Sequence, residues 1–168
     1  MSLTSTDSWY GIRTKSRFEK VTAASLAYKG YEPYLPCYRR RQRWSDRTTE
    51  IEAPLFPRYV SCRFDPTRRL PILTTPGVVC VVGIGRAPAP IPDHEIAAIE
   101  TALKSGLFSE PCSCLPAGQP IRIEEGALTG LEGLVVKSRK RVCLIVSVTL
   151  LQRSVSVEID REWARAIK

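Results

Sequence analysis

The sequence lacks the features of a membrane-spanning or secreted protein. It contains no apolar run of about 18 residues, which a membrane-spanning helix requires, and no short apolar segment behind a charged N-terminus. We therefore expect a cytoplasmic protein with no membrane partner. The 168 residues suit one ordinary domain or two small ones, because domains commonly have about 100 to 150 residues.

Clustered metal ligands are also lacking. The chain has a single histidine, His94, and six cysteines, of which Cys112 and Cys114 form a CxC pair in a loop-like segment. The other four lie in apolar or alternating stretches typical of buried side chains: Cys37, Cys62, Cys80 and Cys143. Structural zinc normally needs two paired ligand clusters, so we expect no metal site, no cofactor and no disulfide framework.

Catalytic motifs are missing as well, since the sequence has no nucleophile elbow, phosphate-binding loop or paired-carboxylate motif. The enzyme alternative would use Cys37, Cys62 or Cys80 as nucleophile and His94 as base. His94 has no obvious carboxylate to orient it except its sequence neighbours. We therefore expect that the protein is not an enzyme.

Positive charge is abundant and unevenly distributed. The net charge is +8, and residues 13–47 hold ten basic side chains against three acidic ones. Within this region the run RRRQR lies between Tyr38 and Trp44. Guanidinium groups among aromatic rings suit a phosphate backbone with unstacked bases, so the region predicts nucleic-acid binding. The alternative is a solvated face, or a charged edge strand that blocks aggregation.

The first part of the chain alternates strand and helix patterns. Residues 9–14 are rich in strand formers, and Ser16 with Glu19 resembles a capping box for a helix from about Arg17 to Lys29, ended by Gly30. Its expected apolar face is Phe18, Val21, Ser25 and Tyr28.

Five further elements are expected before residue 109. Residues 31–44 and 47–53 predict a long exposed hairpin joined around Ser45-Asp46, whose first arm is an edge because of Pro33 and Pro36. Residues 58–64 predict a half-buried strand, 65–73 a turn and short irregular helix, and 77–83 a central strand. A second helix follows, with Asp93 as N-cap, the stripe Ile96, Ile99 and Leu103, and Gly106 as its end.

Composition changes at residues 109–118, where prolines, serines and a glycine interrupt both periodicities. Short β-rich runs at close spacing follow, as in a small barrel of roughly 50 residues. The sequence thus predicts an α+β chain of two modules. They are an α/β sandwich at 8–108 and a small β-barrel at 118–168, joined by a linker at 109–117.

Several segments resemble the NusG family of transcription elongation factors: WYGIRTKSRFEKVTAASLAYKGYEPYLPCYRR, APLFPRYVSCRFD, TTPGVVCVVGIGRAPAPIPDHEI and AGQPIRIEEGALTGLEGLVV. The likeness is greatest to the specialised RfaH- and UpxY-type antiterminators. It implies a NusG-type N-terminal domain, with an antiparallel sheet flanked by helices, and an SH3-like KOW barrel.

The resemblance implies that the first domain binds the clamp helices of the largest RNA polymerase subunit and suppresses pausing or termination. Pro54 and Pro57 fix φ beside Leu55 and Phe56, so these side chains are displayed at little entropic cost. The polymerase-binding residues expected are Trp9, Leu55, Phe56, Pro57, Tyr59 and Val81. The alternative is that Leu55, Phe56 and Trp9 fill the core of their own domain.

The resemblance also implies contact with upstream or non-template DNA through Lys15, Arg17, Lys20, Arg39, Arg40, Arg41 and Arg43. RfaH-type members carry a His-Thr-Thr motif after an FDP turn that touches a second polymerase subunit. Here FDP is followed by TRRLPIL, which places Arg68 and Arg69 near that position.

In the second module we expect tight turns at the glycines of the KOW motif and an inward apolar face. The motif residues are Gly118, Gly126, Leu128, Gly130 and Gly133, and the inward face is Ile121, Ile123, Leu128 and Val135. Relatives bind the small-subunit ribosomal protein NusE or Rho through this domain. Dense β-branched residues favour a barrel over the helical hairpin that one RfaH member stores. A KOW-type RNA-binding or ribosome-associated protein without polymerase contact is the alternative function, and we expect a monomer.

Overall fold

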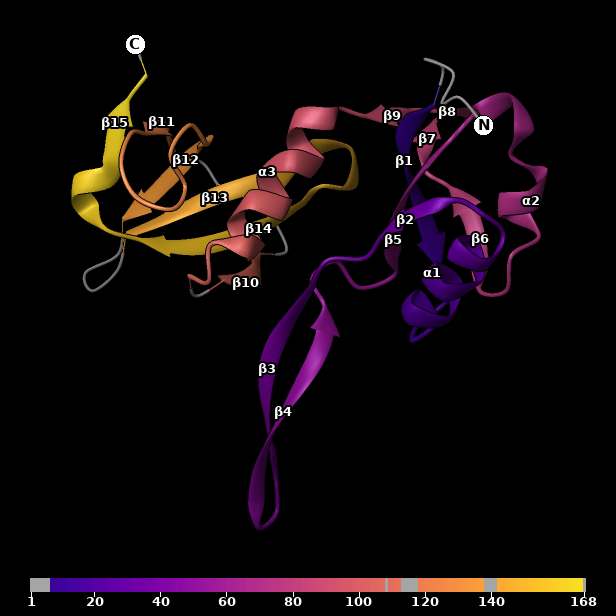
Figure 1. The fold of residues 1–168 in the computed structure, drawn as a ribbon, viewed down its shortest axis with the longest axis horizontal. Coiled ribbons are helices and arrows are strands. Elements are labelled where there is room, and N and C mark those ends of the chain that lie inside the picture. Colours follow the sequence, from indigo (N-terminus) through magenta and orange to yellow (C-terminus); the bar gives the residue numbers. More distant parts are fainter. Residues whose placement is uncertain (1–6, 108, 113–117, 138–141, 168) are drawn as a thin grey trace. The chain divides into compact units, whose positions relative to one another are not determined.

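The computed structural model describes residues 7–107, 109–112, 118–137 and 142–167 (Figure 1). The chain divides into two compact units, Met1–Asp93 and His94–Lys168, which are described separately. Among the described residues, no helix is long and apolar enough to cross a membrane.

The first unit is built on an antiparallel sheet with strand order β2-β5-β1-β6, and β9 also pairs with β1. Its elements are β1 (Ser8–Thr14), α1 (Glu19–Tyr28), β2 (Glu32–Tyr34), β3 (Cys37–Trp44), β4 (Arg47–Pro54), β5 (Tyr59–Phe64), the 3-10 turn η1 (Pro66–Arg68), α2 (Leu70–Leu73), β6 (Val78–Val81), β7 (Gly83–Ile84), β8 (Ala87–Pro88) and β9 (Pro90–Ile91).

One face of this sheet forms a core beneath α1 and α2. Tyr10 and Ile12 of β1 lie opposite Cys62 and Val60 of β5, so their side chains share a face. Leu26 of α1 and Ile72 of α2 complete this buried cluster, together with Phe64. The expected sheet flanked by helices is therefore present in the first unit.

Helix α1 differs from its prediction in both its start and its buried face. It begins at Glu19 after Phe18, and no side chain caps its N-terminus. Its buried residues are Glu19, Thr22 and Leu26, whereas the predicted apolar face of Phe18, Val21 and Tyr28 is exposed. Only a narrow face of α1 packs against the sheet. The buried Thr22 hydroxyl on that face donates a hydrogen bond to the Pro76 carbonyl at 2.8 Å. The predicted stop is confirmed, since Gly30 has φ +91°.

Strand β6 is an edge of the sheet, so the central strand predicted for residues 77–83 is wrong. The register of β1 against β6 shifts between Arg13 and Thr14, where Cys80 and Val78 are the respective partners. This irregularity skips Val79, which is exposed. A continuous apolar run does not distinguish a central strand from a bulged edge strand, because only the pairing partners differ.

Strands β3 and β4 form the predicted hairpin around Ser45-Asp46, as a two-stranded ribbon separate from the main sheet (Figure 1). Residues 31–36, predicted as part of the first hairpin arm, lie outside the hairpin. Strand β2 instead forms an edge of the main sheet next to β5, which confirms the edge position inferred from its proline.

The second unit contains a six-stranded antiparallel sheet with strand order β10-β14-β13-β12-β11-β15. Its elements are α3 (Asp93–Lys104), β10 (Ser109–Cys112), β11 (Gln119–Ile123), β12 (Glu132–Lys137), β13 (Val142–Val148), η2 (Thr149–Leu151), β14 (Arg153–Ile159), η3 (Arg161–Trp163) and β15 (Ala164–Ala166). Strands β10 and β15 are the two edges and do not pair with each other among the described residues. The described residues therefore do not confirm the predicted small β-barrel, which stays a prediction.

The division between the two compact units falls between Asp93 and His94. Helix α3 has the predicted buried residues Ile96 and Ile99, but it belongs mainly to the second unit. There the hydroxyl of Thr149 donates to Glu95 Oε1 at 2.8 Å. The first four residues of the predicted linker form β10, which pairs with β14. Proline and serine interrupt helical periodicity, but they are tolerated in an edge strand such as β10.

The glycines of the second unit serve two different purposes. Gly126 and Gly130 have φ +84° and +91°, as expected for tight turns. At Gly118 and Gly133 an added Cβ would meet the neighbouring strands, 2.8 Å from the Val135 carbonyl oxygen and 2.5 Å from the Ile145 carbonyl oxygen. The predicted inward side chains are all buried: Ile121, Ile123, Leu128 and Val135.

Candidate functional site

The segment between β4 and β5 forms a tight connection at residues 54–59. The backbone N–H of Leu55 donates to the carbonyl of Pro36 at 2.8 Å, and that of Tyr59 donates to the carbonyl of Phe56 at 3.1 Å. Leu55 is fully buried and Phe56 is 4% exposed. In this conformation neither side chain is displayed, as the core interpretation of the sequence expects, and their contact with a partner stays a prediction.

A buried carboxylate holds this connection. Arg58 adopts φ +70°, a left-handed conformation that is costly for a side chain with a Cβ. Its N–H donates to Glu19 Oε1 at 2.9 Å, and its carbonyl accepts from the N–H of Thr14 at 2.8 Å. Sequence reasoning missed this role of Glu19, because a glutamate at a helix start has an equally good local explanation as a cap.

Trp9 is packed by residues of its own unit. Its ring meets that of Tyr34 edge-on at 6.3 Å between centroids, and the guanidinium carbon of Arg63 lies 5.1 Å from its centroid. Trp9 is 7% exposed. In this conformation Trp9 is therefore part of the core of its own unit, as the alternative interpretation expects. Trp9 lies on the same sheet face as Arg13 and Tyr59.

The remaining predicted polymerase-binding residues are more accessible. Pro57 is exposed, while Tyr59 and Val81 are half-buried. Val81 lines a hollow of about 200 Å³ together with Leu73, Cys80 and Pro88, and Arg69 and Arg86 also border it. Arg68 and Arg69 are both exposed, next to a turn capped by Asp65. The hollow is thus lined by a few apolar side chains and bordered by the guanidinium groups of Arg69 and Arg86.

The predicted cationic residues at the start of α1 are all exposed. Lys15 is held by its backbone N–H, which donates to the Gly77 carbonyl at 2.8 Å, and Arg17 has φ +66°. Lys20 Nζ donates to the Glu52 carbonyl at 3.1 Å, which connects α1 to the base of the hairpin. The hydrogen bond from Lys20 therefore holds the basic residues at the start of α1 beside the arginine-rich hairpin.

The register of the hairpin separates its side chains into two faces, because residues directly opposite each other share a face. The arginine–glutamate face comprises Arg39, Arg41 and Arg43 with Glu52, Glu50 and Thr48. The aromatic face comprises Tyr38, Arg40, Gln42 and Trp44 with Ala53, Ile51, Thr49 and Arg47. Arg39, Arg40, Arg41 and Arg43 are all exposed, as predicted.

Two of the candidate thiols, Cys37 and Cys62, lack the properties of a nucleophile. Burial raises the pKa of Cys62 to about 12, and burial with the nearby Glu52 raises the pKa of Cys37. A catalytic thiol needs the opposite shift, because the thiolate is the reactive form. The described residues contain no cluster of three or more possible metal ligands, and Cys114 lies outside them.

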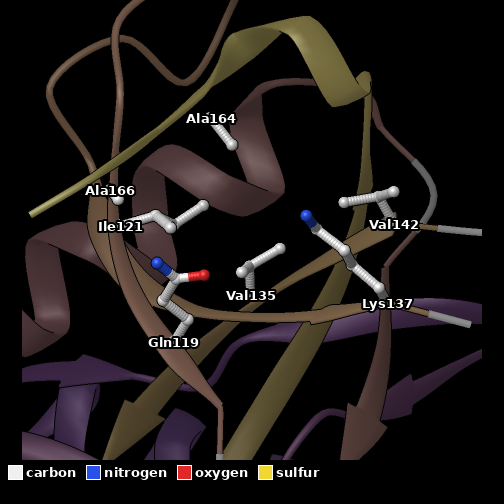
Figure 2. Close-up of a pocket in the computed structure, with 7 residues that line it drawn as sticks. All are labelled: Gln119, Ile121, Val135, Lys137, Val142, Ala164 and Ala166. Carbon is white, nitrogen blue, oxygen red and sulfur yellow. The ribbon is translucent and has the colours of Figure 1, made fainter.

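A hollow of about 270 Å³ lies in the second unit between β11, β12, β13 and β15. Figure 2 shows its lining, with the polar ends of Lys137 and Gln119 directed into a space ringed by aliphatic side chains. The aliphatic residues are Ile121, Val135, Val142, Ala164 and Ala166. The sequence predicted two of these as inward-facing, Ile121 and Val135.

A solved structure supports the fold. The chain is similar to Thermotoga maritima NusG, from a study of its domain interaction, with 18% identity, a TM-score of 0.54, and coverage of 96% of this chain and 98% of that one. It also matches the MjSpt4:Spt5 complex in conformation B, with 15% identity, a TM-score of 0.32, and coverage of 95% and 97%. No curated protein sequence matches.

The family model NusG, described as "Transcription termination factor nusG", matches residues 7–100. This range is more than half of the chain and contains every described element of the first unit. The protein therefore belongs to the NusG family.

Proposed function

We propose that the protein is a transcription elongation and antitermination factor that binds RNA polymerase through its first unit. The observation that carries this proposal is the family match over residues 7–100. On this proposal the protein is not an enzyme, acts in the cytoplasm as a monomer, and suppresses pausing or termination as specialised RfaH- or UpxY-type relatives do.

The polymerase contact is assigned to the clamp helices of the largest subunit. The predicted residues have two roles here. Trp9, Leu55 and Phe56 are buried and give the surface its shape. Pro57, Tyr59 and Val81 retain exposed atoms that a helical tip can contact. A half-buried aromatic such as Tyr59 makes a strong anchor, because its ring is already held in position before binding.

The second polymerase contact is assigned to Arg68 and Arg69. Both side chains are exposed, and Arg69 borders the hollow at Val81. An acidic loop of another subunit is the matching partner, since guanidinium groups bind carboxylates through paired hydrogen bonds.

Nucleic acid is the third partner. Lys15, Arg17 and Lys20 form a cationic group beside the base of the arginine-rich hairpin, to which Lys20 is hydrogen-bonded. Such side chains gain affinity by releasing counterions condensed on phosphates. We assign Lys15, Arg17 and Lys20, together with the hairpin arginines Arg39, Arg40, Arg41 and Arg43, to binding upstream duplex or the exposed non-template strand.

The second unit is proposed to be a KOW domain with an SH3-like barrel that recruits a protein such as NusE or Rho. The turns at Gly126 and Gly130 and the buried Leu128 support this assignment. The domain borders proposed from the sequence are 8–108 and 118–168.

The experiment is a binding titration of the full chain with purified RNA polymerase from the same organism, followed by a pausing assay on stalled elongation complexes. We expect saturable binding and shorter pauses. Binding to RNA without any binding to polymerase would overturn the proposal and favour the RNA-binding alternative.

A further inference from the structure

The two faces of the β3–β4 hairpin differ in how their arginines are compensated. On the arginine–glutamate face, Arg39 lies opposite Glu52 and Arg41 opposite Glu50, with Arg41 Nε 3.9 Å from Glu50 Oε1. Cross-strand pairs of opposite charge attract each other, so these two guanidinium groups are partly neutralised.

The aromatic face has no such compensation. Arg40 lies opposite Ile51, and Arg47 lies opposite Trp44. None of the eight residues on this face is acidic. The acids nearest to it along the chain are Asp46 in the turn, and Glu50 and Glu52, which belong to the arginine–glutamate face. Arg40 and Arg47 therefore have no acidic residue opposite them and lie on the same face.

Trp44 is 56% exposed at the end of this face. A large aromatic side chain left in water forgoes the free energy of burial, about 2 kcal/mol or more for a full side chain. Charged residues alone would keep the hairpin from aggregating, and Trp44 adds nothing to that purpose. An exposed indole between guanidinium groups instead matches the platforms on which nucleobases stack.

We infer that the aromatic face of the hairpin binds single-stranded nucleic acid. Trp44 stacks on an unstacked base, while Arg40 and Arg47 bind phosphates on either side. Arg40 and Trp44 are about 13 Å apart at about 3.3 Å per residue, which accommodates several nucleotides. Duplex is excluded as the preferred ligand because its base faces are covered by neighbouring bases.

This inference rests on the proposed function and narrows it. The sequence assigned Arg39, Arg40, Arg41 and Arg43 to DNA as a group, with Trp44 as a neighbouring ring, whereas the register selects Arg40, adds Arg47 and places both on the face of Trp44. Arg39 and Arg41 lie opposite Glu52 and Glu50 instead, while Arg43 lies opposite Thr48.

The test compares two double variants of the full chain that remove equal charge from opposite faces. Arg40→Ala/Arg47→Ala acts on the aromatic face, and Arg39→Ala/Arg41→Ala on the arginine–glutamate face. Binding of labelled oligothymidylate, about 16 nucleotides long, is measured by anisotropy at several salt concentrations. We expect the first variant to lower the slope of log affinity against log salt by about 1.4, as for two lost phosphate contacts, and the second by less than half of that.

Trp44→Ala and Trp44→Phe test the stacking. The alanine variant is expected to weaken oligothymidylate binding by about fivefold or more, and the phenylalanine variant to retain most of it. Duplex DNA should bind with little dependence on Trp44. Oligouridylate is measured in parallel, and whichever strand loses more affinity in Trp44→Ala identifies the natural ligand as DNA or RNA.

Equal losses in the two double variants, or unchanged single-strand binding in Trp44→Ala, would overturn the inference. Melting temperatures establish that the variants fold, and the hairpin lies outside the main sheet. Polymerase binding is measured separately on the same variants. If wild-type protein binds polymerase but the faces do not differ, the inference fails and the proposed function stands.

Discussion

The backbone N–H of Arg58 donates a hydrogen bond to the buried carboxylate of Glu19, with 2.9 Å between the nitrogen and Oε1. The bond joins the first residue of α1 to the last residue before β5, across 39 positions of sequence. It stabilises a left-handed residue directly after the Pro54–Pro57 segment. The shape of the proposed polymerase-binding surface thus depends on a helix residue that makes no predicted contact with polymerase.

Glu19→Ala is expected to destabilise the protein by about 1 to 2 kcal/mol, because the N–H of Arg58 then loses its acceptor in a part-buried hydrogen bond. Glu19→Gln should cost less, since its amide oxygen still accepts a hydrogen bond. Urea unfolding followed by circular dichroism measures both. Equal losses for the two variants would show that the hydrogen bond is not the source of the effect.

Gly77 and Gly30 provide a matched pair for alanine substitution. Both have positive φ, but an added Cβ at Gly77 would lie 2.6 Å from the Thr22 hydroxyl and 2.7 Å from Phe18 Cβ, whereas at Gly30 nothing lies within 4 Å. Gly30→Ala is expected to cost about 1 kcal/mol for its conformation alone. Gly77→Ala should cost about 1 to 3 kcal/mol more through overpacking. Thermal unfolding distinguishes them, and similar losses would contradict the close packing of α1 against this turn.

Cys62 predicts a loss of stability at alkaline pH. Its pKa is about 12 in the folded protein against an ordinary value of 9.0. Below pH 9 the thiol is protonated in both the folded and the unfolded state, so the buried thiol makes its full contribution to the free energy of unfolding. Above pH 9 the unfolded chain loses the proton first, which favours unfolding by about 1.4 kcal/mol per pH unit until the folded pKa is reached.

The measurement is the free energy of unfolding of wild type and Cys62→Ala between pH 7 and the alkaline range. The alanine variant starts lower because it leaves a small cavity, and the gap between the proteins should narrow above pH 9. A constant gap would contradict the buried, protonated thiol.

The sequence predicts those parts of the fold that depend on local signals. Alternation and the Ser45-Asp46 turn predict the hairpin, and Gly126 and Gly130 occupy positions where positive φ is required. Each of these features needs only a few neighbouring residues, so no knowledge of the tertiary structure is necessary.

Features that depend on distant partners were missed. Glu19 is compatible with a local capping role, and its hydrogen bond from Arg58 is visible only in the folded structure. The buried face of α1 is likewise set by the sheet beneath it. β6 lies at an edge, which only strand pairing reveals. The composition of the two hairpin faces depends on which residues lie opposite each other across the strands. That register follows from the turn geometry, which the sequence alone does not give.

Polymerase binding through the surface beside Phe56 is tested most directly by comparing two tyrosines. Tyr59 is half-buried next to that segment, while Tyr28 is 93% exposed on α1. Affinity for purified RNA polymerase is measured by titration for Tyr59→Ala and Tyr28→Ala, with circular dichroism to establish that both fold. The account predicts a loss of about 30-fold for Tyr59→Ala, corresponding to about 2 kcal/mol, and none for Tyr28→Ala. Wild-type affinity in a folded Tyr59→Ala protein would contradict it.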